Sequence, residues 1–308
     1  MALILNIYVK KHYPYLSEFS GERIGDEEKK TVFSDIKNIF FSRLAAQLLH
    51  STDNIIISTL IGVAINGLYN NYIMVAFALC NLFVTFAASL QPTVANIFLE
   101  GDRDKDRQVF RELSYTFFII AAIVTTGLSA LTGIFVGELW LGEGYLLPHR
   151  TGVLLAVNVG IIILSQPVTI SVTAAGMFKP DKWISLTAAF INLALSIALA
   201  LPFGVDGVIF GSIAANSFGL IFRIIYFYRD HLNMSVKGFM PEFASYLVCA
   251  GISVSAGIRV TGFIDTDIPI LDFLLGGVGC VFIALLISVI PFIKTDRFKG
   301  LINILKNT

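Results

Sequence analysis

Long apolar stretches without a charge alternate with short charged segments along most of this 308-residue chain. The uncharged stretches are residues 54–99, 113–137, 151–178, 183–205 and 273–293, with shorter ones at 207–222 and 243–258. A helix needs roughly 20 mostly apolar residues to cross the hydrocarbon core of a bilayer. The pattern therefore predicts an all-α, polytopic helical membrane protein.

Boundaries placed at charges, glycines and prolines predict about eight full transmembrane helices. They cover residues 38–61, 67–98, 112–136, 151–175, 184–203, 207–228, 243–262 and 269–293. Residues 1–9 have the composition of the last turns of a preceding transmembrane helix, so we expect the chain to be clipped and more membrane helices to lie upstream. The span 67–98 is too long for a straight crossing and is expected to tilt, or to bend at Pro92.

Composition agrees with this class. Hydrophobic residues make up 56% of the chain and charged residues only 14%, against about 25% in soluble domains. The net charge is zero, so no overall field attracts nucleic acid. Cys80, Cys249 and Cys280 each lie in an apolar stretch and have no metal-ligand spacing, so we expect small buried side chains and no metal site.

Basic residues predict the orientation of the chain in the membrane. Of the 22 Lys and Arg residues, 20 fall in residues 10–37, 100–111, 179–182, 223–237 and 294–306 or at Arg43. The alternate connections hold only Arg150 and Arg259. Because Lys and Arg collect in cytoplasmic loops, we expect the basic segments and the C-terminus on the cytoplasmic side of a cell membrane.

The charged segments at the two ends of the chain have separate interpretations. Residues 10–37 are expected to form a cytoplasmic connector before the first full span. Residues 294–308 place apolar and basic side chains at helical spacing, which predicts a short amphipathic helix on the inner leaflet.

The first full span carries a row of polar side chains, here named the polar stripe. It consists of Arg43, Gln47, His50, Ser51, Asn54 and Ser58, which fall within about 100° of arc on a helical wheel, with Asp53 at its edge. A charged side chain at the bilayer centre costs at least ~2.5–3.5 kcal/mol and normally faces a protein interior or a watery cavity. The sequence therefore predicts that the stripe faces a cavity.

The alternative is that these polar side chains hydrogen-bond between packed helices. It is the better explanation for Gln47 and the two serines, whereas Arg43 and Asp53 favour a cavity. Those two cannot pair with each other, because ten residues of helix separate them by ~15 Å. His50 and Asp53 are one turn apart and can interact.

Two Gln-Pro pairs interrupt predicted spans, in LQPTVAN (90–96) and SQPVTIS (165–171). A proline frees a backbone carbonyl, which is tolerated in a membrane only beside protein or water. Interrupted helices recur at transporter sites, and a simple kink at Pro92 or Pro167 is an equally good explanation. Asn158, Asn192 and Asn216 are isolated asparagines inside spans and are expected to be packing contacts.

No sequence motif for catalysis emerges. The chain has no GxSxG, HExxH or Walker-type loop, and its longest outer loop spans only residues 137–150. We therefore expect a protein that is not an enzyme and that holds no cofactor.

Several stretches resemble the second half of bacterial polysaccharide flippases. They are STDNIIIS (51–58), GLYNNYIMV (67–75) and AAGMFKPDKWISLTAAFINLALSIALALPFGVDGVIFGS (174–212). These flippases belong to the multidrug/oligosaccharidyl-lipid/polysaccharide exporter superfamily, and the resemblance covers essentially the whole chain. It implies that residues 38–228 are the C-terminal six-helix lobe, that 229–293 are a terminal helix pair, and that an N-terminal lobe is missing upstream.

The resemblance implies an activity, which is the flipping of polyprenyl-diphosphate-linked oligosaccharides across the bilayer for capsule, O-antigen or other surface polysaccharide. The lipid-linked oligosaccharide and glycan polymerase or assembly proteins are then the expected partners. Arg43 suits the diphosphate, and Gln47 and Asn54 suit sugar hydroxyls. Asp53, with His50, is the candidate for coupling to H⁺ or Na⁺.

Two other functions stay open from the sequence. One is a cation-coupled drug exporter of the same superfamily, which has little need for Arg43. The other is a truncated, inactive half or a scaffold of a glycan-assembly complex.

Overall fold

The computed structural model describes residues 8, 12 and 25–293, and every regular element in this part of the chain is a helix. Seven helices among the described residues are long and apolar enough to cross a membrane: Val63–Phe98, Arg103–Trp140, His149–Ala174, Phe178–Phe203, Val205–His231, Val236–Thr261 and Pro269–Phe292. The predicted class, an all-α polytopic membrane protein, is confirmed.

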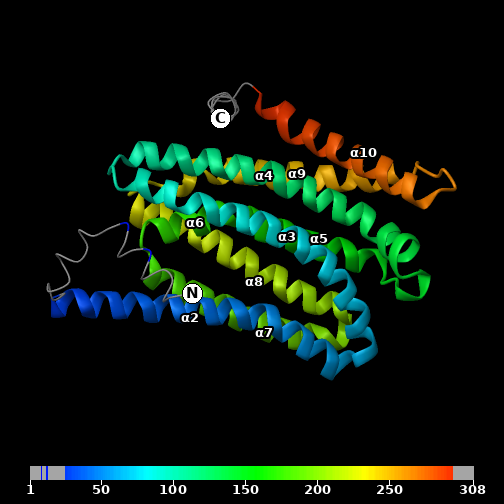
Figure 1. Ribbon diagram of the computed structural model, residues 1–308, viewed down its shortest axis with the longest axis horizontal. Coiled ribbons are helices and arrows are strands. Elements are labelled where there is room, and N and C mark those ends of the chain that lie inside the picture. Colours follow the sequence, from blue (N-terminus) through cyan, green and yellow to red (C-terminus); the bar gives the residue numbers. More distant parts are fainter. Residues whose placement is uncertain (1–7, 9–11, 13–24, 294–308) are drawn as a thin grey trace.

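The elements carry the labels of Figure 1. They are α2 (Asp26–Ile56), η2 (Ile57–Ile61), α3 (Val63–Phe98), α4 (Arg103–Ile134), η3 (Phe135–Trp140), η4 (Glu143–Tyr145), α5 (His149–Leu164), α6 (Gln166–Ala174), α7 (Phe178–Phe203), α8 (Val205–Tyr226), η5 (Phe227–His231), η6 (Val236–Gly238), α9 (Met240–Thr261), α10 (Pro269–Val289) and η7 (Ile290–Phe292).

The one predicted span that is not among these seven, residues 38–61, is the first in the chain and lies within α2 and η2. Its polar side chains make it less apolar than the other seven, and the same helix begins earlier, at Asp26, in the predicted connector 10–37. The predicted remnant 1–9, apart from residue 8, and the predicted tail helix 294–308 lie outside the described residues.

The helices lie side by side, with their connections at two ends of the bundle (Figure 1). The basic segments 100–111, 179–182 and 223–237 fall at one end, together with the start of α2. The short connections after η2, η3, α7 and α9 fall at the other end. This is the alternation that the distribution of Lys and Arg predicts.

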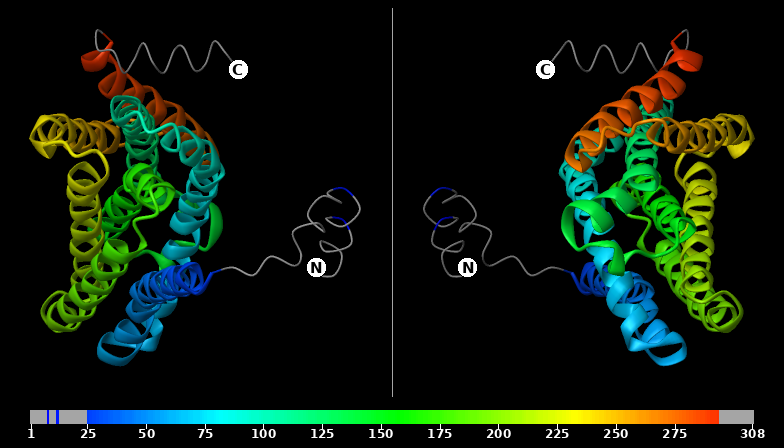
Figure 2. Two further views of the ribbon diagram at one scale, coloured as in Figure 1. Left: turned by 90° about the vertical axis from the view of Figure 1, so that its left-hand side faces the viewer. Right: turned by 90° about the vertical axis from the view of Figure 1, so that its right-hand side faces the viewer.

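The bundle has two edges that differ in the helices they contain. α2 packs along α7 at one edge, whereas α9 and α10 pack on each other and on α4 at the opposite edge. The end-on views of Figure 2 show α3 running obliquely from the α2 side to the α4 side. The oblique course agrees with the tilt expected for a helix of this length.

The predicted terminal helix pair packs tightly on α4. A Cβ on Gly257 of α9 would lie 2.3 Å from the Thr126 side chain, and a Cβ on Gly276 of α10 would lie 2.8 Å from Leu131. Glycines at these two positions allow the close helix approach that is typical of membrane proteins. At the basic end, the Tyr115 hydroxyl also donates to the Ser288 carbonyl at 3.2 Å.

The two Gln-Pro pairs behave differently. Helix α3 continues through Pro92, which is exposed, without a break. At Pro167 the span is divided, because α5 ends at Leu164 and α6 begins at Gln166. The side chains of Ser165 and Gln166 donate to the Ile162 carbonyl at 2.7 and 2.8 Å, so polar groups at this break are satisfied within the protein.

Candidate functional site: a buried carboxylate between three helices

The polar stripe lies at the surface of the described chain. Arg43, Gln47 and Ser51 are exposed, and Gln47 Nε2 donates to Ser51 Oγ at 3.0 Å. Asn54 is half-buried, and its Oδ1 atom has no hydrogen-bond partner among the described residues. The side chain of His50 lies outside the described residues. If the polar stripe lines a cavity, the opposite wall of that cavity must be formed by residues other than the described ones.

Asp53 does not share this surface, which corrects the expectation that it borders the same cavity. Asp53 is 7% exposed, and its side chain points away from the stripe, toward α7 and α8. Ser212 Oγ donates to Asp53 Oδ2 at 2.7 Å, and Asn192 Nδ2 lies 3.4 Å from Oδ1. The contacts of Asp53 are those that the alternative of hydrogen bonding between packed helices predicts.

A larger polar group surrounds this carboxylate, here named the Asp53 cluster. It consists of the side chains of Asp53, Asn192, Ser196 and Ser212 and the carbonyl of Val208. Asn192 Nδ2 donates to Ser212 Oγ at 2.9 Å and lies 3.4 Å from Ser196 Oγ. Ser196 Oγ donates to the Val208 carbonyl at 3.2 Å. Helices α2, α7 and α8 therefore meet at one buried polar centre.

The local sequence explains why this centre forms. Asn192 and Ser196 are four residues apart on α7, as are Val208 and Ser212 on α8, so each pair lies on one helix face. A Cβ on Gly211 would lie 2.3 Å from Ser196 Oγ. The glycine brings the backbones of α7 and α8 close enough for short hydroxyl side chains to meet.

α2 has a second polar attachment nearer the basic end. Ser42 Oγ donates to Asp181 and lies 3.0 Å from Ser185 Oγ, both on α7. Arg223 of α8 pairs with the same Asp181, with Nε 2.7 Å from Oδ1. The Asp181 carboxylate is therefore paired with a permanent positive charge, that of Arg223.

Asp53 has no such partner, since no salt bridge to it occurs within the described residues. An isolated buried charge is costly, and neutral Ser and Asn donors stabilise a carboxylate without cancelling its charge. Either a proton or a bound small cation can cancel it. The carboxylate, hydroxyl and carbonyl oxygens of the Asp53 cluster are the hard ligands that such a cation prefers. The Asn192 amide can add its oxygen, because its oxygen and nitrogen can exchange places by rotation of the side chain.

The composition of the Asp53 cluster also limits which cation it can hold. Among the described residues, no three His, Cys, Asp or Glu side chains lie together as a metal site. A single carboxylate with neutral oxygens suits a monovalent ion or a proton better than a divalent metal, which usually takes several charged ligands.

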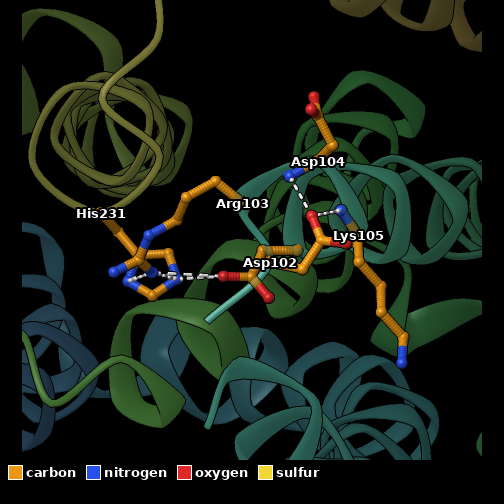
Figure 3. Close-up of polar contacts among 6 residues, drawn as sticks. Asp102, Arg103, Asp104, Lys105 and His231 are labelled. Atoms are coloured by element: carbon orange, nitrogen blue, oxygen red, sulfur yellow. Dashed lines mark hydrogen bonds and ion pairs between the residues drawn. The ribbon is translucent and has the colours of Figure 1, made fainter. Parts of the chain in front are cut away.

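A second buried carboxylate lies at the basic end, at the start of α4. The Asp106 side chain is 0% exposed, and its Oδ2 accepts from His231 Nε2 at 2.9 Å and from Arg103 Nη1 at 3.2 Å. Figure 3 shows the Arg103 and His231 side chains against each other, beside the turn where Asp102 caps the backbone of Asp104 and Lys105. Arg103 of the same helix pairs with this charge, and His231 of a neighbouring element donates a hydrogen bond to it.

The expected packing role of the isolated asparagines is confirmed. Asn216 Nδ2 of α8 donates to Asn158 Oδ1 of α5 at 2.9 Å, and Asn192 is fully buried in the Asp53 cluster. What the sequence interpretation missed is that Asn192, Ser196 and Ser212 surround Asp53. The available signal was the four-residue spacing of small polar side chains opposite Gly207 and Gly211.

Comparison with known proteins adds no assignment: no family model, curated protein or solved structure matches the chain. A functional proposal therefore rests on the residues described above.

Proposed function

We propose that this chain is the ion-coupled half of a transporter that moves polyprenyl-diphosphate-linked oligosaccharides across a cell membrane. The observation that carries the proposal is the Asp53 cluster. It is a buried carboxylate whose partners among the described residues are all neutral, at a point where three helices meet. Such a group changes its interactions when it gains or loses a proton or a cation, which is what ion coupling requires.

The position of Asp53 on α2 links the ion to the substrate in this proposal. Asp53 faces α7 and α8, whereas Arg43 and Gln47 are exposed elsewhere around the same helix. Neutralising the carboxylate changes how firmly α2 is held against α7 and α8. A ligand can shift such an equilibrium only by its different affinity for the two states. The affinity for a substrate on the exposed side of α2 then depends on whether the ion site is occupied.

The polar stripe supports the substrate class. Arg43 makes no ion pair with the described residues, and a guanidinium matches phosphate oxygens with two parallel hydrogen bonds. Gln47, Ser51 and Asn54 offer the amides and hydroxyls that suit sugars. The proposal includes a second lobe that faces the stripe, together with glycan polymerase or assembly proteins as partners.

The test places Arg43→Ala and Arg43→Lys at the chromosomal copy of the gene, so that any additional lobe is retained. Surface polysaccharide and the accumulated lipid-linked precursor are measured. We expect Arg43→Ala to abolish export while membrane insertion persists. Arg43→Lys should restore only part of it, because a point charge replaces a two-pronged donor. The matched control is Arg259→Ala, since Arg259 is also exposed but lies at the end of the bundle opposite the basic segments.

Wild-type polysaccharide in the Arg43→Ala cells would contradict the substrate assignment. The Asp53 cluster also suits a cation-coupled drug exporter, and this function predicts drug efflux that depends on Asp53 and not on Arg43. A scaffold predicts that neither Arg43→Ala nor Asp53→Asn alters export or efflux.

A further inference from the structure

A groove opens at the end of the bundle opposite the basic segments. Its volume is about 760 Å³, and it lies between the start of α5, the end of α7, the start of α8 and the end of α9. Its walls are apolar and include Val153, Leu154, Phe210 and Ile258. Helix ends at this level lie near the headgroup region of a bilayer that the spans cross.

The lining of the groove carries two opposite charges side by side. Arg150 Nε lies 2.6 Å from Asp206 Oδ2, and Thr151 Oγ1 donates to Asp206 Oδ1 at 2.6 Å. The Arg150 side chain is 77% exposed, so its terminal N–H groups remain open to a ligand. The Asp206 carboxylate has two of its roughly four acceptor positions occupied. His149 adds a further imidazole to the lining.

We propose that this groove binds one phospholipid with a phosphoethanolamine headgroup. The terminal N–H groups of Arg150, with His149, hold the phosphate, as guanidinium groups commonly do. The lipid ammonium donates to Asp206, and one acyl chain follows Val153, Phe210 and Ile258. This site is separate from the Asp53 cluster and from the polar stripe, and it does not depend on the proposed transport function.

The charges of the groove select among lipids. Arg150 and Asp206 together are neutral, so they match a headgroup with both signs better than an anionic one, whose negative charge would approach Asp206. A phosphocholine headgroup keeps both charges but has no N–H to donate to the carboxylate. Phosphatidylethanolamine is therefore expected to bind more tightly than phosphatidylcholine or phosphatidylglycerol.

The experiment is native mass spectrometry of the purified full chain, titrated with these three lipids carrying identical acyl chains. We expect binding of phosphatidylethanolamine to be about tenfold tighter than that of phosphatidylcholine, the effect of one charge-assisted hydrogen bond. Arg150→Gln should weaken the binding of all three lipids about tenfold, because each carries the phosphate that Arg150 holds. Asp206→Asn should remove the preference, because the carboxylate is the group that distinguishes an ammonium from a choline headgroup. Arg259→Gln, which removes the other arginine at this end without touching the groove lining, should retain it.

A second variant covers the case in which Arg150→Gln fails to fold because Asp206 loses its partner. Val153→Trp fills the groove and leaves the Arg150–Asp206 pair in place, so it should lower lipid binding about tenfold or more. Equal affinity for the three lipids, or tighter binding of phosphatidylglycerol, would overturn the proposed headgroup. An unchanged affinity for phosphatidylethanolamine in folded Val153→Trp would overturn the location.

Discussion

Four carboxylates are buried among the described residues, those of Asp53, Asp106, Asp206 and Glu242. Asp53 and Asp106 have surroundings that are opposite in kind. Asp106 lies in the first turn of α4 and contacts Arg103 and His231. Asp53 lies along α2 between α7 and α8, with Ser212 and Asn192 as its partners. Both are nearly inaccessible to solvent, so burial alone does not distinguish them.

The difference lies in the source of the positive charge. At Asp106 the neighbouring Arg103 supplies it permanently, and the hydrogen bond from His231 makes the contact a fixed link between α4 and the segment that follows α8. At Asp53 the described residues supply none, and in the proposed function the charge comes from a proton or an ion that arrives and leaves. A fixed link suits stability, whereas an exchangeable one suits a conformational change.

The largest expected effect comes from neutralising the fixed link. Asp106→Asn replaces the carboxylate that accepts from Arg103 and the buried His231 with a neutral amide, and losing these two hydrogen bonds to a charged group costs about 3 kcal/mol of unfolding free energy. Asp53→Asn keeps the shape of the side chain and removes an uncompensated charge, so we expect a change below ~1 kcal/mol. Equilibrium unfolding of both purified variants in detergent measures the difference. Equal losses would remove the distinction between the two sites.

The next effect concerns the exchangeable charge. If Asp53 binds Na⁺, the chain should gain about 2.7 kcal/mol of stability at a sodium concentration 100 times the dissociation constant, with choline as the reference cation. The gain should shrink as the pH falls, because a proton competes for the same carboxylate. Thermal unfolding of the purified chain provides the measurement.

Asp53→Asn should abolish this sodium effect, and Arg43→Ala, on the exposed side of the same helix, should retain it. A sodium gain of the same size in Asp53→Asn would place the ion elsewhere. A wild-type chain that responds to pH and not to sodium would identify the proton as the coupled ion.

A smaller effect is expected where α7 and α8 approach each other. A Cβ at Gly211 would meet Ser196 at both Oγ and the backbone nitrogen, so Gly211→Ala should cost about 2 kcal/mol by overpacking and also reduce the sodium effect. Gly251→Ala is the matched control, because its Cβ would meet nothing within 4 Å. That variant should be stabilised by up to ~1 kcal/mol through helix propensity. A neutral result at Gly211 would show that the helices can separate without loss.

The smallest expected effect is the free energy of one hydrogen bond between two neutral side chains. The hydrogen bond between Asn158 and Asn216 joins two uncharged side chains between α5 and α8. A double-mutant cycle with alanine at both positions should give a coupling of about 0.6 kcal/mol, as is usual between membrane helices. None of the three variants should alter the sodium effect. A coupling above ~2 kcal/mol would weaken the argument that neutral contacts are minor here.

The spans were predictable from the sequence because charges mark where apolar segments stop. The exact helix ends were not, since hydrophobicity detects the part inside the bilayer and helices continue beyond it. α7 begins at Phe178, six residues before the predicted span 184–203, because helical hydrogen bonds continue through its charged first turns. For the same reason α2 begins at Asp26, within the predicted connector.

The site was predictable only in part. A helical wheel gives the angles between Arg43, Gln47 and Asp53 but not which side of the helix packs against its neighbours. Asp53 contacts residues 139 and 159 positions away, and no local pattern joins them to it. The polar residues themselves could be recognised, whereas their grouping required the arrangement of α2, α7 and α8.

The break between α5 and α6 gives one span a mechanical property that its neighbours lack. At Ser165 the carbonyl of Ile162 is held by two side chains, which can rotate with it, and Pro167 has no N–H to lose. The angle between the two halves can therefore change without exposing a backbone polar group to lipid. We therefore expect a displacement of α6 at the basic end to be absorbed at this joint, so that the far end of α5 stays in place while the rest of its span moves.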